Sequence, residues 1–214
     1  MNSAATTPAT APAAEPDLLT QVARCHAQLT APGAPFELIE LSVNGQTLPA
    51  YRNAFASLPA LLDAGRVHGA REFMVYQDDR WTFDRFYQAV DALAGRLQAE
   101  HGVKAGDRIA IAMRNRPEWA VAFVAAAMLG AVPAPLNSFG LQGELLANLR
   151  DIKPRWLICD VERFARVGED LAALDCRAVV LEGAPGQGDA DWAALIAPGA
   201  PAVQPPALEP GDDA

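Results

Sequence analysis

The stretch RIAIAMRNRPEWAVAFVAAAMLGAVPAPLN, residues 108–137, decides the fold. Residues 108–113 are apolar after the first position, which is typical of a buried strand. Asn115 can then cap a helix that runs to Leu129, and residues 131–134 form a second short apolar strand. A strand, a helix and a strand at this spacing predict a βαβ unit, whose two strands lie parallel.

The same alternation continues on both sides of this unit. It predicts an α/β fold with a mainly parallel sheet flanked by helices. Further helices are expected over residues 82–100, 142–151 and 161–174, and further strands over 73–77, 80–82, 155–159 and 177–181.

An N-terminal β-hairpin is predicted ahead of this pattern. Residues 36–43 alternate apolar and polar side chains, Asn44-Gly45 is a strong two-residue turn signal, and residues 46–52 form the returning strand. After the hairpin, Ser57 can cap a helix that continues to about Val67.

Composition separates the two ends of the chain from its middle. Residues 1–16 are rich in Ala, Thr and Pro and contain no Lys or Arg, which predicts a disordered tail. Residues 183–214 form a Pro/Gly-rich acidic segment, in which we expect nothing longer than a helical turn at 191–196. Residues 17–182 are expected to form the α/β domain between them.

Charge and cysteine content exclude several classes of protein. The 214 residues contain 17 Lys and Arg against 26 Asp and Glu, so the formal net charge is −9. This balance argues against a nucleic-acid-binding module and against a polybasic membrane anchor. The sequence has no secretory signal and no apolar run of membrane-spanning length, and its three scattered cysteines do not form a disulfide framework. We therefore expect a cytoplasmic protein with no membrane span.

No residue pattern for catalysis or for cofactor binding is found. The two lysines, Lys104 and Lys153, precede Ala and Pro, so a Walker-type phosphate loop is absent. No G-x-G-x-x-G follows a strand, no serine lies in Gly-x-Ser-x-Gly, and the histidines are far apart. His101, beside Gly102, is interpreted as a favourable charge at a helix C-terminus. We therefore assign no catalytic, cofactor-binding or metal-ligating residue.

Three positions leave two interpretations open. Residues 114–116 (Arg-Asn-Arg) open a helix, either as an anion site or as a cap with solvated arginines. Ser138 follows a strand, either as a functional loop residue or as a loop residue whose hydroxyl is satisfied. Arg163 and Arg166 could hold a phosphate, or they could pair with Glu162, Glu169 or Asp170.

Motifs in a fixed order carry a family resemblance. They are APGAPFE (31–37), RWTF (80–83), GDRIAI (106–111), MRNRPEW (113–119), AAAMLGAVPAPLN (125–137), GEL (143–145) and LICD (157–160). In order and spacing they resemble the acyl-CoA synthetases of the AMP-forming, adenylate-forming enzyme superfamily. The resemblance covers residues 30–214 and implies the N-terminal subdomain of such an enzyme.

The resemblance implies an ATP-dependent carboxylate–CoA ligase for a fatty or aryl acid, with ATP, Mg²⁺ and CoA as the cofactors of the full-length enzyme. In the family, a Ser/Thr/Gly-rich phosphate loop follows a segment like residues 209–214. The resemblance therefore implies that the chemistry lies beyond this chain, that the chain binds none of these cofactors, and that it is inactive alone. Its expected partners are the following subdomain, the C-terminal domain and further copies of itself. The alternative is a non-catalytic, stand-alone module that binds a partner chain.

Overall fold

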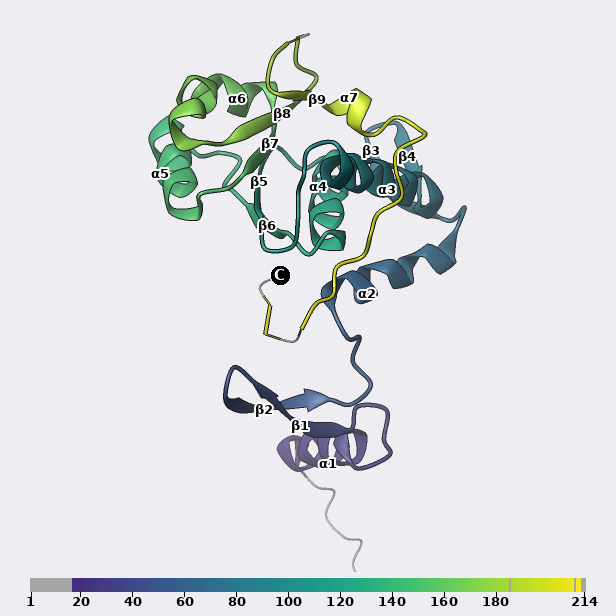
Figure 1. The fold of residues 1–214 in the computed structure, drawn as a ribbon. Coiled ribbons are helices and arrows are strands. Elements are labelled where there is room, and N and C mark those ends of the chain that lie inside the picture. The colour runs from purple at the N-terminus through teal and green to yellow at the C-terminus, as the bar shows by residue number, and fades with distance from the viewer. Residues whose placement is uncertain (1–16, 185, 210, 213–214) are drawn as a thin grey trace, which may run out of the picture. The chain divides into compact units, whose positions relative to one another are not determined.

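Five parallel strands form the central sheet of this structure, a computed structural model that describes residues 17–184, 186–209 and 211–212 (Figure 1). Their order is β6-β5-β7-β8-β9, and every neighbouring pair is parallel. The α/β fold expected from the sequence is therefore confirmed. The strands are β5 (Arg108–Ala112), β6 (Val132–Pro135), β7 (Trp156–Asp160), β8 (Arg177–Leu181) and β9 (Ala190–Asp191).

Helices cover both faces of this sheet (Figure 1). One face carries α3 (Phe83–Ala99) and α4 (Pro117–Met128), and the other carries α5 (Gln142–Ile152) and α6 (Val161–Val167). Because alternate residues of a strand point to opposite faces, β5 contributes Ile109 and Ile111 to one core and Ala110 and Ala112 to the other.

A small hairpin and two short helical segments precede α3. The hairpin is β3 (Glu72–Tyr76) paired antiparallel with β4 (Asp79–Thr82). The Ser57 hydroxyl accepts a hydrogen bond from the Ala60 amide and begins α2 (Leu58–Asp63), as expected. The chain then continues as the 3₁₀ helix η1 (Ala64–His68), so the expected helix to Val67 changes its winding after Asp63.

The chain divides into two units, one ending at Ala54 and the other beginning at Phe55. The first unit holds the predicted hairpin, β1 (Leu38–Val43) paired with β2 (Gln46–Tyr51). Asn44 and Gly45 both adopt positive φ, as a tight hairpin turn requires. It also holds a helix that we did not predict, α1 (Leu18–Thr30), which the Asp17 carboxylate caps by accepting from the Thr20 amide.

The predicted N-cap of α4 was wrong. Arg116, not Asn115, is the N-cap residue, and its side chain makes no capping hydrogen bond. Proline restricts the residue before it to an extended backbone. Arg116 precedes Pro117 and has φ −154° and ψ 159°. The helix therefore begins at Pro117, one residue later than it would with Asn115 as the N-cap.

The single helix predicted over 161–174 is also wrong. Helix α6 ends at Val167 and is followed by two 3₁₀ segments, η2 (Gly168–Asp170) and η3 (Ala172–Leu174). The ring of Phe164 lies over Gly168, where a β-carbon would be 2.9 Å from ring atoms. Glycine is a poor α-helix former, so the winding changes where the sequence supplies one.

The acidic segment after β8 contains more structure than we expected. Strand β9 was not predicted, because two residues are too few to give a periodic signal. The expected helical turn is present as α7 (Trp192–Leu195), whose first amides donate to the Asp191 carboxylate. Within the described residues, none of the helices combines the length and apolar character that a membrane span requires.

We predict that Leu93→Ala lowers the free energy of unfolding by about 2–5 kcal/mol, because it opens a cavity in a packed core. Leu93 lies on α3 and is fully buried. Leu61→Ala is the matched control, since Leu61 on α2 is 50% exposed, and it should cost about 1 kcal/mol or less. Urea denaturation of both variants measures the difference, and equal losses would contradict this placement of the core.

Candidate functional site

The topology of the sheet marks one point on its carboxyl edge as the candidate site. The loop after β5 leads to α4 on one face, whereas the loop after β7 leads to α6 on the other. Strands β5 and β7 are neighbours. In open parallel sheets, ligands bind where the loops of two adjacent strands leave in opposite directions, at the carboxyl ends of the strands. We name the point between the ends of β5 and β7 the switch point.

A buried ion pair occupies the switch point. Asp160, the last residue of β7, is 6% exposed, and Arg163, on the first turn of α6, is 2% exposed. The Arg163 guanidinium donates to the Asp160 carboxylate at 3.1 Å, and the Arg163 amide donates to it at 3.0 Å. The amide of Arg114, from the loop after β5, also donates to Asp160, at 3.2 Å. One carboxylate therefore joins the loops that follow β5 and β7.

The same helix holds the loop that follows β6. Arg163 Nε donates to the Ser138 carbonyl at 2.6 Å, and Arg166 donates to the Gly140 carbonyl at 2.5 Å. Both guanidinium groups also donate to Glu162. The expected pairing with Glu162 is confirmed, and the phosphate-binding interpretation of these two arginines is not supported. Ser138 is a loop residue that contributes its carbonyl to this network.

Arg116 connects the start of α4 to the end of β8. Its guanidinium donates to Glu118 at 2.9 Å and to Glu182 at 2.7 Å. These hydrogen bonds raise the pKa of Arg116, chiefly through Glu182, and lower the pKa of Glu182. The guanidinium of Arg114 lies 3.9 Å from the ring centroid of Phe139. Arg116 is therefore already paired with two carboxylates. This pairing does not favour the anion-site interpretation of residues 114–116.

The triphosphate and metal ion that the resemblance implies set requirements on the residues around the switch point. A triphosphate needs cations with free donors, whereas Arg116, Arg163 and Arg166 donate to carboxylates and carbonyls. Lys104 and Lys153 precede β5 and β7 and so lie at the opposite edge of the sheet. Among the described residues, no group of three His, Cys, Asp or Glu could hold a metal ion. Three of the four arginines at the switch point are therefore already engaged by groups of the chain itself, and the fourth, Arg114, lies over the ring of Phe139.

The interpretation of His101 as a helix-terminal charge was wrong. Burial and the neighbouring Arg177 charge lower the pKa of His101, which favours the neutral imidazole. Two arginines supply the positive charge at this terminus instead. Arg155 and Arg177 donate to the His101 carbonyl at 3.3 and 3.0 Å.

Sequence reasoning missed the role of Asp160, although a usable signal was present. An aspartate at the end of a buried strand, just before a helix, is a typical N-cap residue. An arginine three residues later lies on the first turn of that helix, within reach of the same carboxylate. The two observations together would have predicted the pair of Asp160 and Arg163.

We predict that Arg163→Met lowers the free energy of unfolding by about 3–5 kcal/mol, because it leaves the buried Asp160 carboxylate without its cation. The double variant Asp160→Asn/Arg163→Met should lose less than the single one, since no charge is then left unpaired. Arg166→Met is the control, because its ion-pair partner Glu162 is exposed, and it should cost about 1 kcal/mol or less. Urea denaturation measures all three, and a double variant that loses as much as Arg163→Met, or more, would contradict the coupling.

We also predict that a thiol reagent modifies only Cys25 in the native chain. Cys25 is exposed, whereas Cys159 and Cys176 are buried. Burial raises the pKa of Cys159 and raises that of Cys176 to about 12, so neither forms the reactive thiolate near neutral pH. Absorbance of the released thiol reports the number of groups that react before and after denaturation. Three thiols reacting at one rate in the native chain would refute the burial of Cys159 and Cys176.

Comparison with known proteins identifies relatives of this chain. The family model described as AMP-binding enzyme matches residues 61–213. An L-proline–L-prolyl-carrier-protein ligase of Streptomyces coelicolor is 34% identical over 108 residues, 50% of this chain and 20% of the relative. A 2-succinylbenzoate–CoA ligase of Bacillus velezensis is 31% identical over 100 residues, 47% of this chain and 20% of the relative. Long-chain fatty acid transport protein 6 of Homo sapiens is 30% identical over 125 residues, 55% of this chain and 20% of the relative. The chain thus spans about a fifth of the length of these curated relatives.

Solved structures share the fold. A benzoate CoA ligase from Burkholderia xenovorans has a TM-score of 0.63 at 21% identity, over 72% of this chain and 31% of that one. The N-terminal subdomain of NpsA from Klebsiella oxytoca, in complex with 3-hydroxyanthranilyl-AMSN, has a TM-score of 0.57 at 20% identity, over 74% and 36% of the two chains. At these identities the likeness shows the fold, that of an N-terminal subdomain. Because the family model matches most of its residues, the chain belongs to the AMP-binding enzyme family, as its motifs implied.

Proposed function

We propose that the chain is the N-terminal structural part of an ATP-dependent carboxylate–CoA ligase. Family membership supports the enzyme class, and the fold supports the N-terminal position. The single observation that carries the structural role is the arrangement at the switch point. Asp160 and Arg163 tie the loops after β5, β6 and β7 to one another, so these residues position loops.

The proposed parent reaction has two steps. A carboxylate attacks the α-phosphorus of ATP and gives an acyl adenylate and pyrophosphate, and the thiolate of CoA then displaces AMP. For the acid we propose a fatty or aryl carboxylate. The relative named as a 2-succinylbenzoate–CoA ligase supports an aryl acid, and the one named as a fatty acid transport protein supports a fatty acid.

On its own, the chain is proposed to bind none of ATP, Mg²⁺ and CoA productively. Adenylation needs donors that are already aimed at the developing charge and a metal ion that stabilises the leaving pyrophosphate. At the switch point, the donors of Arg116, Arg163 and Arg166 are held by carboxylates and carbonyls. Recruiting them would break the ion pairs that hold the loops together.

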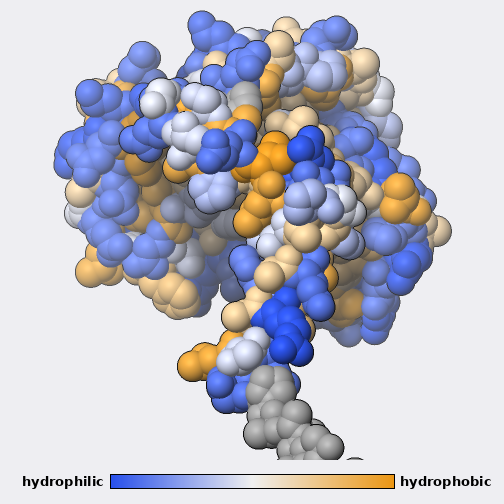
Figure 2. Space-filling view, turned by 90° about the horizontal axis from the view of Figure 1, so that it is seen from below, coloured by the Kyte–Doolittle hydropathy of each residue, from blue (hydrophilic) through white to orange (hydrophobic). Residues whose placement is uncertain are grey.

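The proposed partners are the following subdomain and the C-terminal domain of the enzyme, in the cytoplasm. Hydrophobic residues reach the surface in several places in Figure 2. In the loop after β6, Phe139 is 71% exposed and Leu141 is 75% exposed. Exposed apolar side chains next to a functional edge are typical of surfaces that another domain covers. In the isolated chain, the same side chains favour self-association.

We predict that the purified 214-residue chain shows no acid-dependent exchange of pyrophosphate into ATP, with fatty or aryl acids. Incorporation of labelled pyrophosphate into ATP measures this exchange. A 2-succinylbenzoate–CoA ligase is the positive control, and a reaction without protein is the blank. Exchange above the blank would show that the chain binds ATP productively and would contradict the proposal.

The same chain extended through the downstream codons of its gene separates the two functions considered. Exchange by the extended chain alone supports the ligase. A gene that gives no extended product, with no exchange under any condition, supports the alternative of a stand-alone module that binds a partner chain.

A further inference from the structure

The segment that follows α7 lies along α3 in an extended conformation. This segment, residues 197–209, is named the strap; in Figure 1 it is the yellow trace that descends past α3. It begins after α7, which follows the carboxyl end of β9. Near its other end, Pro206 and Leu208 approach Gly130, the turn residue before β6. The strap therefore brings the chain back to the amino edge of the sheet.

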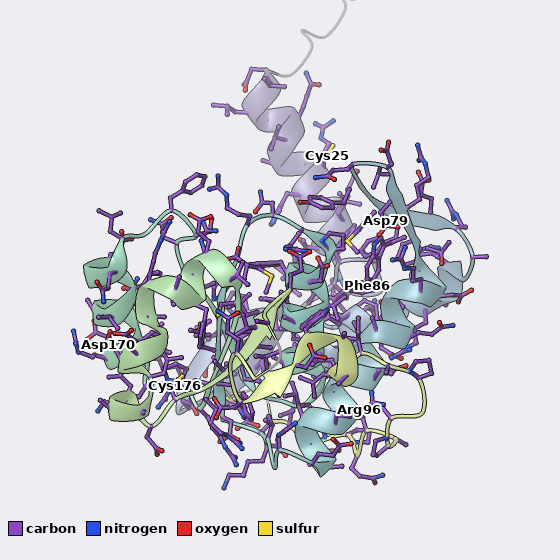
Figure 3. All side chains as sticks on the ribbon, turned by 90° about the horizontal axis from the view of Figure 1, so that it is seen from above. Cys25, Asp79, Phe86, Arg96, Asp170 and Cys176 are labelled. Carbon is purple, nitrogen blue, oxygen red and sulfur yellow. The ribbon has the colours of Figure 1, made fainter. Side chains whose placement is uncertain are left out.

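Two side chains of α3 bind the main chain of this region. Gln98 donates to the Gln204 carbonyl at 2.9 Å and accepts from the Gln204 amide at 2.7 Å, as a paired strand would. Arg96 donates to the carbonyls of Leu195, Ala197 and Pro198 at 2.9, 2.6 and 3.2 Å. Figure 3 labels Arg96 beside this segment. These contacts involve backbone atoms of the segment, so they fix the register of the strap and do not depend on the identity of its side chains.

A glycine lets the strap approach the helix. A β-carbon on Gly95 would lie 2.0 Å from the carbonyl oxygen of Pro201, a distance that no neighbouring side-chain movement can relieve. Gly95 lies in the interior of α3, where glycine costs about 1 kcal/mol of helix stability relative to alanine. A helix-interior glycine at this contact is therefore explained by the close approach of the strap.

The strap is held mainly by hydrogen bonds, with Val203 as a partly buried contact against the core. None of its described residues is buried, and a groove of about 900 Å³ remains between the strap, α3 and α7. The sheet, by contrast, is held by two buried cores. Segments with few buried apolar contacts open at a lower free energy than the core they lie on.

We infer that α3 binds the strap through a clamp formed by Gly95, Arg96 and Gln98, which holds the main chain of the strap in one register. We also infer that the strap opens as a unit while the sheet stays folded. A strand that started from the amino edge would run parallel to β5–β8. The clamp would thus position the segment that follows the strap. The positioning of a following segment rests on the proposed function, whereas the binding of the strap by α3 does not.

Amide hydrogen exchange of the full 214-residue chain tests the inference, with the Gln204 amide as the reporter. Gly95→Ala and Arg96→Met do not touch Gln204, which Gln98 binds. If the strap opens as a unit, both variants should raise the exchange rate of the Gln204 amide at least tenfold. The amides of β5 and β7 should keep their rates.

Matched controls separate the clamp from general effects of substitution. Gly143→Ala makes the same change in α5, where a β-carbon would meet nothing within 4 Å. Arg85→Met changes another arginine of α3 that lines the same groove but pairs with Asp79. Neither control should change the Gln204 rate.

Two outcomes would overturn the inference. One is a Gln204 rate that stays at the wild-type value in Arg96→Met. The other is an equal acceleration of the β5 and β7 amides, which would make the strap part of the global folding unit. If Gly95→Ala fails to fold, Arg96→Met decides alone. Hydrogen exchange involves no nucleotide, so its result is independent of the ligase assay.

Discussion

The carboxylate of Asp160, buried at the end of β7, is the group on which the loop edge of the sheet depends. Burying a charge is costly unless it is paired and fully hydrogen-bonded. Here one carboxylate accepts from the guanidinium and the amide of Arg163 and from the amide of Arg114. Arg163 then reaches the Ser138 carbonyl, so three loops share one buried ion pair. Removing the Arg163 charge would leave the Asp160 carboxylate unpaired in the interior, whereas removing the Asp160 charge would leave Arg163 with Glu162 alone. In either case the three loops would lose their common anchor.

The same arrangement occupies the part of the sheet at which parallel α/β folds commonly bind nucleotides. The switch point of a parallel sheet offers converging loops and helix N-termini, which suit phosphate groups. In this chain the first turn of α6 presents its Arg163 amide to Asp160 instead. Arg116 at the start of α4 is likewise paired with Glu118 and Glu182. The positions that would meet an anion are filled by carboxylates of the chain itself.

The fold was largely predictable from the sequence, because buried parallel strands and capped helices leave periodic signals. The strand over 177–181 was predicted with its observed bounds. The errors arose where a local rule competed with another. Asn115 is a good N-cap residue, but Pro117 forces the extended conformation on Arg116. Strand β9 exists only because β8 offers an edge, and no two-residue pattern can predict that.

The site itself was less predictable, because side-chain pairing depends on tertiary neighbours. Pairing on their own helix was one of the two interpretations left open for Arg163 and Arg166, and Glu162 does pair with both. Their contacts with Ser138 and Gly140 span about 25 residues of sequence and require the folded sheet. Irregular segments of this chain are thus held in two ways. The loops at the switch point depend on a buried ion pair, which resists opening. The strap depends on exposed hydrogen bonds from α3, which resist it less. In the proposed ligase, a segment that leads to the following subdomain gains from the second arrangement, since it can adjust without disturbing the sheet.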